Sequence, residues 1–225
     1  MTKKCAVLFS GGKDSCLALH KARQAGLKID YLLSIMPENP DSFMFHKPYL
    51  ELLTKQAEEL DIELVIKGSK GEKEKELMDL RNLIESVKDK IDVIVVGGIA
   101  SSYQGNRISK ICDELNLEFF APLWDYSPEE VWDELLKEKF KVILTKIACE
   151  GLPKEMLGKI IDKENLKKLK KLADKYKFRI DFEGGEAESF VVYMPGFKKE
   201  IKLEFDILSQ GKYNSIIKIK LKKLK

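Results

Sequence analysis

The sequence predicts an α/β protein: a doubly wound, Rossmann-like parallel sheet followed by a smaller mixed α/β domain. Short apolar runs alternate with segments of helical periodicity through the first half of the chain. Strands that are apolar on both faces are typical of parallel sheets covered by helices. After Pro122 the pattern changes to amphipathic helices and alternating strands, which indicates a second domain.

The first domain is expected to contain five strands separated by helices. The predicted strands are 5–9, 31–36, 63–67, 91–96 and 118–120, each a short run of mainly apolar residues. The predicted helices are 14–24, about 49–60, about 72–87 and 101–115. Gly26 is expected to end the first helix, and Pro48 suits the start of the second.

The second domain is expected to begin with a helix after Ser127, because a serine N-cap followed by proline and two glutamates favours a helix start. A strand is predicted over 142–148, and a lysine-rich amphipathic helix carries Leu166, Leu169, Leu172 and Tyr176. Apolar residues alternate with charged ones from Ile201 to Ile207, which predicts an antiparallel strand with one buried face. We place the domain boundary after residue 122, giving domains 1–122 and 123–225.

The composition indicates a globular protein that is rich in charged residues but has little net charge. The 225 residues are 34% charged, but acids and bases nearly cancel, and a formal net charge of +3 does not indicate nucleic acid as a partner. A surface rich in lysine and glutamate is typical of thermophiles. No stretch resembles a signal peptide or a membrane span, so we expect a cytoplasmic protein without a membrane partner. The sequence leaves the oligomeric state open, with a homodimer as one alternative.

The four cysteines lie far apart in the chain and form no CxxC pair. Isolated cysteines in apolar surroundings usually behave as small buried hydrophobic residues. We therefore expect Cys5, Cys16, Cys112 and Cys149 to serve packing rather than metal binding.

The segment Ser10-Gly11-Gly12-Lys13-Asp14-Ser15 lies between the first predicted strand and the first predicted helix. Two glycines allow the backbone to turn sharply and to approach a ligand closely. The helix that follows directs its free N–H groups and positive dipole end at the loop, which makes an anion site. The lysine adds a positive charge, and the aspartate and serine suit Mg²⁺ coordination and phosphate hydrogen bonding.

This segment is not a Walker A loop, because Val7 stands where the first glycine is required and Asp14 follows the lysine. Instead, SGGKDS resembles the PP-loop of the N-type ATP pyrophosphatases. The resemblance implies that the β- and γ-phosphates of ATP are held as a unit while the bond between the α- and β-phosphates is cleaved. A capped glycine turn without function is the structural alternative.

Further segments extend the resemblance over nearly the whole chain. They are 38–46, 97–104 with Arg107, 121–124, 150–152, 157–159 and 183–189. Together they resemble the diphthine–ammonia ligase family. That family uses ATP and ammonia to convert the carboxylate of diphthine, a modified histidine of translation elongation factor 2, into an amide, with release of AMP and pyrophosphate. The chain departs from the family pattern at Ala187, where an aromatic residue is expected, and at Ser189, where threonine is expected.

The resemblance and the residue chemistry together suggest roles for individual side chains. Catalytic roles are assigned to Lys13, Asp14, Arg107 and Glu186, with Asp14 as the Mg²⁺ ligand. ATP is expected to contact Ser10, Gly11, Gly12, Lys13, Asp14, Ser15, Gly97, Gly98 and Arg107. Substrate contacts are assigned to Asn39, His46, Tyr103, Gln104, Glu183, Glu186 and Glu188, and ATP is expected to lie between the two domains.

Several of these residues also have simple structural interpretations. Arg107 is consistent with a solvated surface charge, His46 with a loop anchor, and the three glutamates with a polar turn before a strand. The second histidine, His20, lies within a helix and is expected to pack. The lysines of the 218–223 tail are expected to line one face of an edge strand.

Two functional alternatives remain: a PP-loop enzyme that modifies tRNA bases, and a nucleotide sensor without catalytic activity. Sulfur-inserting PP-loop enzymes often carry CxxC pairs, and glutamine-dependent amidotransferases need a glutaminase domain. This chain has neither the pairs nor the length, which favours free ammonia as the nucleophile.

Overall fold

The computed structural model describes residues 2–37, 50–69, 73–97 and 102–220. Contacts within the chain divide it into two units, Met1–Asp125 and Tyr126–Lys225. The sequence had placed the domain boundary after residue 122. In the described part of the chain, no helix is long and apolar enough to cross a membrane.

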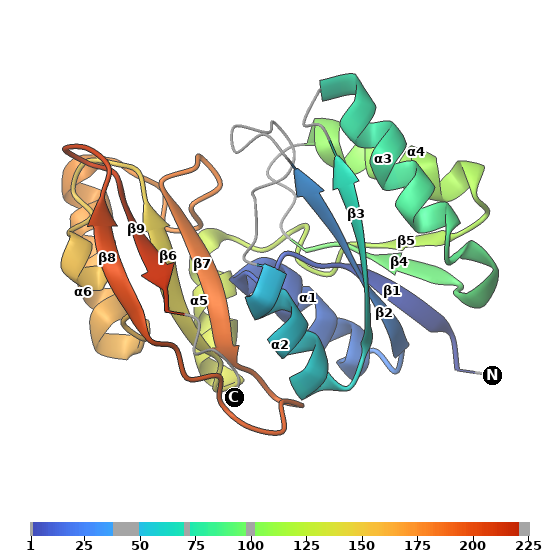
Figure 1. The fold of residues 1–225 in the computed structure, drawn as a ribbon, viewed down its shortest axis with the longest axis horizontal. Coiled ribbons are helices and arrows are strands. Elements are labelled where there is room, and N and C mark those ends of the chain that lie inside the picture. Colours follow the sequence, from blue (N-terminus) through green and yellow to red (C-terminus); the bar gives the residue numbers. More distant parts are fainter. Residues whose placement is uncertain (1, 38–49, 70–72, 98–101, 221–225) are drawn as a thin grey trace. The chain divides into compact units, whose positions relative to one another are not determined.

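A five-stranded sheet with only parallel pairings forms the centre of the first unit (Figure 1), which confirms the predicted fold class. The strand order is β3-β2-β1-β4-β5. The strands are β1 (Lys4–Leu8), β2 (Lys28–Pro37), β3 (Glu63–Ser69), β4 (Val93–Val95) and β5 (Glu118–Phe120). β2 starts three residues earlier than predicted, and β4 is shorter than the apolar run that predicted it.

Helices cover both faces of this sheet (Figure 1). They are α1 (Lys13–Gln24), α2 (Leu50–Leu60), α3 (Lys73–Glu85) and α4 (Ser102–Glu114), with a short 3₁₀ helix at Lys88–Lys90. α1 and α2 lie on one face, and α3 and α4 lie on the other. This is the doubly wound arrangement that alternating strands and helices predict.

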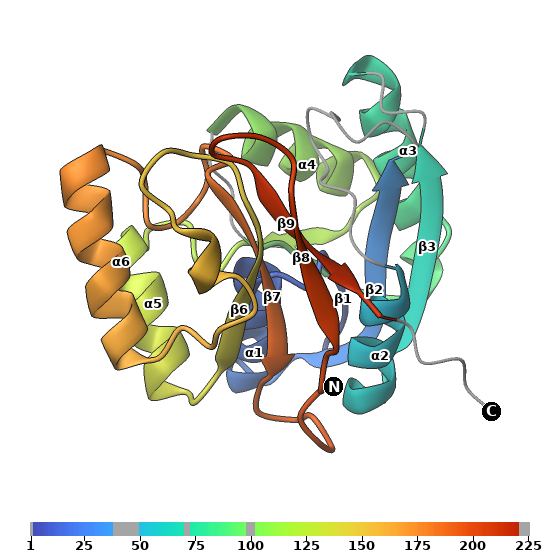
Figure 2. The same ribbon diagram turned by 60° about the vertical axis from the view of Figure 1, so that its left-hand side comes forward.

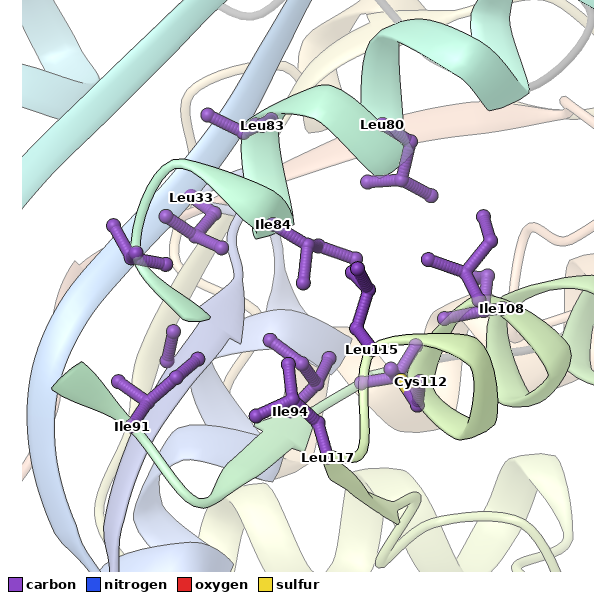
Figure 3. Packing of buried hydrophobic residues seen from close by; sticks show 14 of the residues in the cluster. Leu33, Leu80, Leu83, Ile84, Ile91, Ile94, Ile108, Cys112, Leu115 and Leu117 are labelled. Carbon is purple, nitrogen blue, oxygen red and sulfur yellow. The ribbon is translucent and has the colours of Figure 1, made fainter. Parts of the chain in front are cut away.

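The core between the sheet and the α3–α4 pair consists of aliphatic side chains (Figure 3). Ala6, Leu33 and Ile94 project from three adjacent strands, and Ile84 and Cys112 meet them from the helices. All five are at most 1% exposed. Burial of such side chains is the main favourable contribution to folding. Here it holds in place β1 and β4, the strands that lead into residues 10–15 and Gly97.

The second unit is an antiparallel sheet in the order β7-β6-β9-β8, with two helices on one face (Figure 2). Its elements are α5 (Pro128–Lys137), β6 (Lys141–Ile147), a 3₁₀ helix (Lys154–Met156), α6 (Lys163–Tyr176), β7 (Ala187–Tyr193), β8 (Phe205–Ser209) and β9 (Ser215–Ile219).

Side-chain caps mark the starts of both helices, and the start predicted after Ser127 is confirmed. Ser127 and Glu130 form a capping box at the start of α5, and the carboxylate of Asp162 accepts the N–H of Asn165 at the start of α6. Trp132 anchors α5 in the core, since it is fully buried and its Nε1 donates to the carbonyl oxygen of Ile180 at 2.8 Å.

Two predictions for the last strands are wrong. The strand expected from Ile201 begins only at Phe205, and Ile207, expected inside, is 40% exposed. β8 is the edge strand next to β9, and both of its faces are exposed, since Leu208 on the opposite face is 43% exposed. The strand that carries Lys218 is not an edge strand, because β9 lies between β6 and β8. Alternation in a sequence shows two faces but not the place of a strand in its sheet.

Candidate active site

The point where the strand order reverses lies between β1 and β4. From β1 the chain adds β2 and β3 on one side, and it later returns to place β4 and β5 on the other side. The loops after β1 and β4 therefore leave the same edge of the sheet as neighbours, which is where sheets of this type bind ligands. The structure thus brings together two predicted site segments, residues 10–15 and Gly97.

Hydrogen bonds among its own serines and backbone groups shape the loop after β1. The Ser15 hydroxyl donates to the carbonyl oxygen of Gly12 at 3.2 Å and accepts the N–H of Ser10 at 3.3 Å. The hydroxyls of the two serines lie 3.2 Å apart, and the N–H of Gly12 donates to Ser10 Oγ at 3.4 Å. Gly11 has a φ angle of +75°, a conformation that favours glycine. The loop is therefore a folded turn with a defined shape.

Helix α1 begins directly at this loop. Gly12 is its N-cap, and no side chain of the described residues caps the helix. The first-turn N–H groups of an α-helix have no partner within the helix, and the positive end of the helix dipole lies there as well. A helix start of this kind, preceded by glycines, is suited to bind an anion such as a phosphate group.

The side chain of Lys13 is buried in this loop. It is 2% exposed, and its Nζ lies 2.7 Å from Oδ2 of Asp14, whose side chain is 25% exposed. Burial of an ammonium group is costly unless anionic groups balance it. The charge of Lys13 and the dipole of α1 together make the start of this helix electropositive.

Gly97, which follows β4, lies against the start of α1. A Cβ atom at Gly97 would lie 2.7 Å from the backbone nitrogen of Ser15 and 2.8 Å from the carbonyl carbon of Asp14. Both neighbours are backbone atoms and cannot rotate away. Glycine is therefore required here for the β4 loop to approach the helix so closely.

Gln56 of α2 also contacts the loop, and the sequence analysis did not identify it. Its side chain is fully buried, and its Nε2 donates to the carbonyl oxygen of Gly11 at 3.0 Å. A Cβ atom on Gly11 would lie 2.4 Å from Oε1 of Gln56. The signal for this contact was a polar residue within the apolar face of a helix, flanked by Leu53 and Leu60.

Arg107 lies in α4, where its side chain is half-buried. Tyr103 and Gln104 belong to the first turn of the same helix, which starts five residues after Gly97. Three other predicted site residues, Asn39, His46 and Gly98, lie outside the described residues.

The three predicted acidic residues of the second unit have different surroundings. Glu188 of β7 forms an ion pair with Lys146 on the neighbouring strand β6, at 3.1 Å. Glu186 directs Oε1 towards the N–H of Arg179 at 3.2 Å, while its Oε2 is buried without a hydrogen-bond partner among the described residues. The N–H of Glu183 donates to a carboxylate oxygen of Asp181 at 3.2 Å. Each glutamate therefore engages a different partner.

Gly151 and Gly158, from two of the segments that carry the family resemblance, lie under aromatic rings of the second unit. A Cβ atom on Gly151 would lie 2.3 Å from the ring of Tyr176, and one on Gly158 would lie 1.9 Å from the ring of Phe205. Both glycines also have positive φ angles. The adjacent Glu150 accepts a hydrogen bond from the hydroxyl of Tyr213 at 3.0 Å. These contacts give a packing role to segments 150–152 and 157–159, two of the segments that carry the family resemblance.

The thiols behave as the sequence predicted for three cysteines. Cys5, Cys16 and Cys112 are buried, and Cys149 is half-buried. Burial raises the pKa of Cys5 and of Cys112 to about 12. Burial, followed by the nearby carboxylate of Glu186, raises the pKa of Cys149 to about 11. These thiols therefore stay protonated near neutral pH. Separately, the residues that the structure describes contain no group of three or more acidic, histidine or cysteine side chains able to hold a metal ion.

The first unit thus belongs to the class of doubly wound α/β proteins with a glycine-rich, lysine-bearing loop at the switch point of a parallel sheet. Family models narrow this class further. Residues 3–119 match the diphthamide synthase N-terminal domain, and residues 127–224 match the diphthamide synthase C-terminal domain. The chain belongs to the diphthine–ammonia ligase (diphthamide synthase) family, as the resemblance of its motifs predicted.

Individual relatives agree with this assignment. Proteins named diphthine–ammonia ligase are 33% identical in Bos taurus and 32% identical in Homo sapiens, and each alignment covers 88% of this chain and 82% of the relative. The relative of that name in Saccharomyces cerevisiae is 28% identical over 96% of this chain and 37% of its own length.

A solved structure described as a predicted subunit of tRNA methyltransferase from Methanocaldococcus jannaschii aligns with 88% of this chain and 100% of that one. Its TM-score is 0.45 at 19% identity, a similarity too distant to indicate a function.

Proposed function

We propose that this protein is an ATP-dependent ligase that converts the carboxylate of diphthine, on translation elongation factor 2, into the amide of diphthamide. Ammonia is the nitrogen donor. Family membership and the names of the relatives support this reaction. The observation that carries the proposal is the loop at residues 10–15, where a glycine-capped helix start and a buried lysine meet at the switch point of the sheet.

In the first half-reaction, a carboxylate oxygen of diphthine attacks the α-phosphorus of ATP. The bond from that phosphorus to the bridging oxygen breaks, and pyrophosphate leaves with the electron pair. The chain contributes chiefly electrostatic stabilisation of the leaving group. The N–H groups at the start of α1 and the charge of Lys13 are the groups available in the described loop for the β- and γ-phosphates.

The other residues of the nucleotide site have supporting roles in this proposal. Ser10 and Ser15 hold the shape of the loop, and glycines at 11, 12, 97 and 98 allow the phosphates to approach the backbone. Arg107 adds a guanidinium group, which pairs well with phosphate oxygens.

Asp14 is the residue that we propose for Mg²⁺. It is partly exposed, and one of its oxygens is engaged by Lys13, so the carboxylate retains a second oxygen. Carboxylate oxygens are the protein ligands that Mg²⁺ prefers. A bound Mg²⁺ would add positive charge next to the phosphates.

In the second half-reaction, the nitrogen of ammonia attacks the acyl carbon, and the bond between that carbon and the AMP oxygen breaks. The attacking nitrogen must lose a proton, and we assign this proton to Glu186. The buried Oε2 of Glu186 supports this role, since it accepts no hydrogen bond from the described residues. Substrate contacts complete the proposal and involve Asn39, His46, Tyr103, Gln104, Glu183 and Glu188.

The decisive experiment follows the products of ATP in three reactions: with diphthine-bearing elongation factor 2 and ammonium, with bulk tRNA, and with neither. AMP and pyrophosphate are expected only in the first reaction. Elongation factor 2 with an unmodified histidine is the matched control and should give no turnover.

Other results of the same assay would replace this proposal. Accumulation of ADP would contradict the PP-loop assignment. Pyrophosphate release that depends on tRNA would identify a tRNA-modifying enzyme, and nucleotide binding without turnover in any reaction would identify a sensor.

A further inference from the structure

A groove of about 660 Å³, lined by residues of α5 and α6, lies within the second unit. Leu136 and Leu166 contribute apolar surface to it, and lysines dominate the remainder. The lysines that line the groove are Lys137, Lys139, Lys163, Lys167, Lys170 and Lys171.

The positive charges of this groove are largely uncompensated. Asp133 and Asp174 are the two acidic residues that line it, so six lysines leave an excess of four positive charges. Lys137 pairs with Glu134 at 3.2 Å, and the other five lysines form no ion pair with the residues that the structure describes. The formal net charge of the whole chain is only +3, which is less than the excess of four charges in the groove. Acidic residues elsewhere therefore balance the remaining basic residues, and the positive charge is concentrated in the groove.

Helix stability does not explain this arrangement. Lys163, Lys167 and Lys171 follow one another at intervals of four residues, and like charges at this spacing destabilise a helix. Lys163 is also the first residue of α6, at the positive end of the helix dipole. On an adjacent face of the same helix, Glu164 and Lys168 form a stabilising pair at 2.8 Å. The lysine row therefore carries a cost to the helix that an anionic partner would relieve.

The lining indicates a protein partner rather than RNA. Interfaces that bind nucleic acid commonly use arginine forks and aromatic rings to hold phosphates and bases, and the groove has neither. An acidic peptide segment can direct carboxylates to the lysines and apolar side chains to the two leucines, as amphipathic helices do in grooves between helices.

We propose that the α5–α6 groove is the docking surface for an acidic, amphipathic segment of the protein substrate. This inference rests on the proposed function, because it assumes that the substrate is a folded protein. The groove contributes to capture of that protein and takes no part in the chemistry.

The test is a triple charge reversal, K167E/K170E/K171E. The control reverses three exposed lysines of the same unit that do not line the groove, Lys154, Lys175 and Lys202. With diphthine-bearing elongation factor 2 as the varied substrate, the groove variant should raise KM by roughly tenfold or more at low salt, because charge reversal slows electrostatically steered association. The kcat of the groove variant and its KM for ATP should stay unchanged. The control variant should change the KM for the elongation factor by no more than about twofold.

Salt provides a second readout. Added salt should raise the KM of the wild-type protein steeply and that of the groove variant only slightly, because screening removes an attraction that the variant lacks. A merely structural role of these lysines would alter thermal unfolding without changing this salt dependence. If the triple variant did not fold, the single reversals K167E and K171E would carry the same test.

Direct binding separates this inference from the proposed function. If the wild-type protein bound the elongation factor without amidating it, the reaction would be wrong, and loss of binding in the groove variant would still support the docking surface. An unchanged KM and unchanged binding in that variant would overturn the inference. Loss of tRNA binding in the variant, with binding of the elongation factor intact, would also overturn it and assign the groove to RNA.

Discussion

At the scale of single residues, the loop after β1 depends on two buried polar side chains from different elements. Lys13 brings the positive charge, and Gln56 holds the carbonyl oxygen of Gly11 from the neighbouring helix. Each lies in surroundings that exclude water, where removal of one partner of a polar interaction has large consequences. Both residues therefore give measurable predictions.

Replacement of Lys13 by methionine should keep the volume of the side chain and remove its charge. We expect pyrophosphate release to fall by roughly ten- to hundred-fold, since a charge-assisted hydrogen bond contributes about 1.5–3 kcal/mol. The rate of pyrophosphate formation from ATP measures the effect. Lys28→Met is the control, because Lys28 forms an ion pair with Asp30 at 2.7 Å but is 62% exposed and outside the loop. A Lys13→Met variant with the wild-type rate would place the phosphates elsewhere.

Replacement of Gln56 by leucine should remove the donor to Gly11 and leave that carbonyl oxygen without its side-chain partner. A buried acceptor that loses its hydrogen bond costs about 1–3 kcal/mol, and we expect this loss to loosen the loop and weaken ATP binding. Titration calorimetry with ATP, together with thermal unfolding, measures both effects. Thr54→Ala on the exposed face of α2 is the control, since Thr54 bonds only to its own helix, at the carbonyl of Leu50. Lower thermal stability with unchanged ATP affinity would limit Gln56 to a structural role.

At the scale of elements, the site depends on how closely the end of β4 approaches the start of α1. Gly97 makes this approach possible, and its neighbours are backbone atoms of Asp14 and Ser15. A side chain at this position would separate β4 from the start of α1, next to the switch point between β1 and β4. The effect of such a change should therefore appear at the loop and in the stability of the sheet together.

Replacement of Gly97 by alanine should separate β4 from α1 because the added Cβ would lie 2.7 Å from the nitrogen of Ser15. Overpacking of this kind typically costs about 1–3 kcal/mol, so we expect lower thermal stability and weaker ATP binding. Gly68→Ala in β3 is the matched control, because a Cβ at Gly68 meets nothing within 4 Å. Equal behaviour of the two variants would show that the approach of Gly97 to α1 is unimportant.

Local patterns in the sequence were sufficient to predict most helices and strands, but not which of them pair or pack with one another. Apolar runs predicted the five parallel strands, and the cap at Ser127 predicted the start of α5, because these features depend on nearby residues. The positions of β8 and β9 were predicted wrongly, since a place at the edge or the centre of a sheet depends on distant pairings. The contact of Gln56 with Gly11 was missed for the same reason, because 45 residues separate the two.

At the scale of the whole molecule, the proposed reaction divides into adenylation and amide formation, and the two units carry different predicted residues. The first unit holds the loop at residues 10–15, and the second holds Glu186. If this division is correct, a variant in the second unit should separate the two half-reactions.

Replacement of Glu186 by glutamine should preserve the first half-reaction and slow the second. Glutamine retains an acceptor for the N–H of Arg179 but cannot take a proton from ammonium at neutral pH. Loss of a general base typically costs about 10²–10⁴-fold in rate. Pyrophosphate release reports adenylation, and the rate of amide formation against ammonium concentration reports the second step. Glu155→Gln, an exposed residue of the same unit, is the control.

The opposite pattern would change the assignment of this residue. If Glu186→Gln lost pyrophosphate release while the response to ammonium stayed normal, Glu186 would belong to substrate positioning.

The strand order of the first unit also sets when the site can exist during biosynthesis. β1 is made first, but its second neighbour, β4, follows almost ninety residues later. The hydrogen bond from the N–H of Lys4 to the carboxylate of Asp92 joins residues 88 positions apart in the sequence. Pairings between such distant segments form slowly, because the chain must close a long loop before they contribute. A nascent chain that carries the complete SGGKDS loop therefore lacks the backbone of Gly97 beside it until β4 has left the ribosome. If ATP binds the finished loop as proposed, it will favour the completed sheet by mass action. On this proposal the nucleotide would act on the folding of the protein as well as on its reaction.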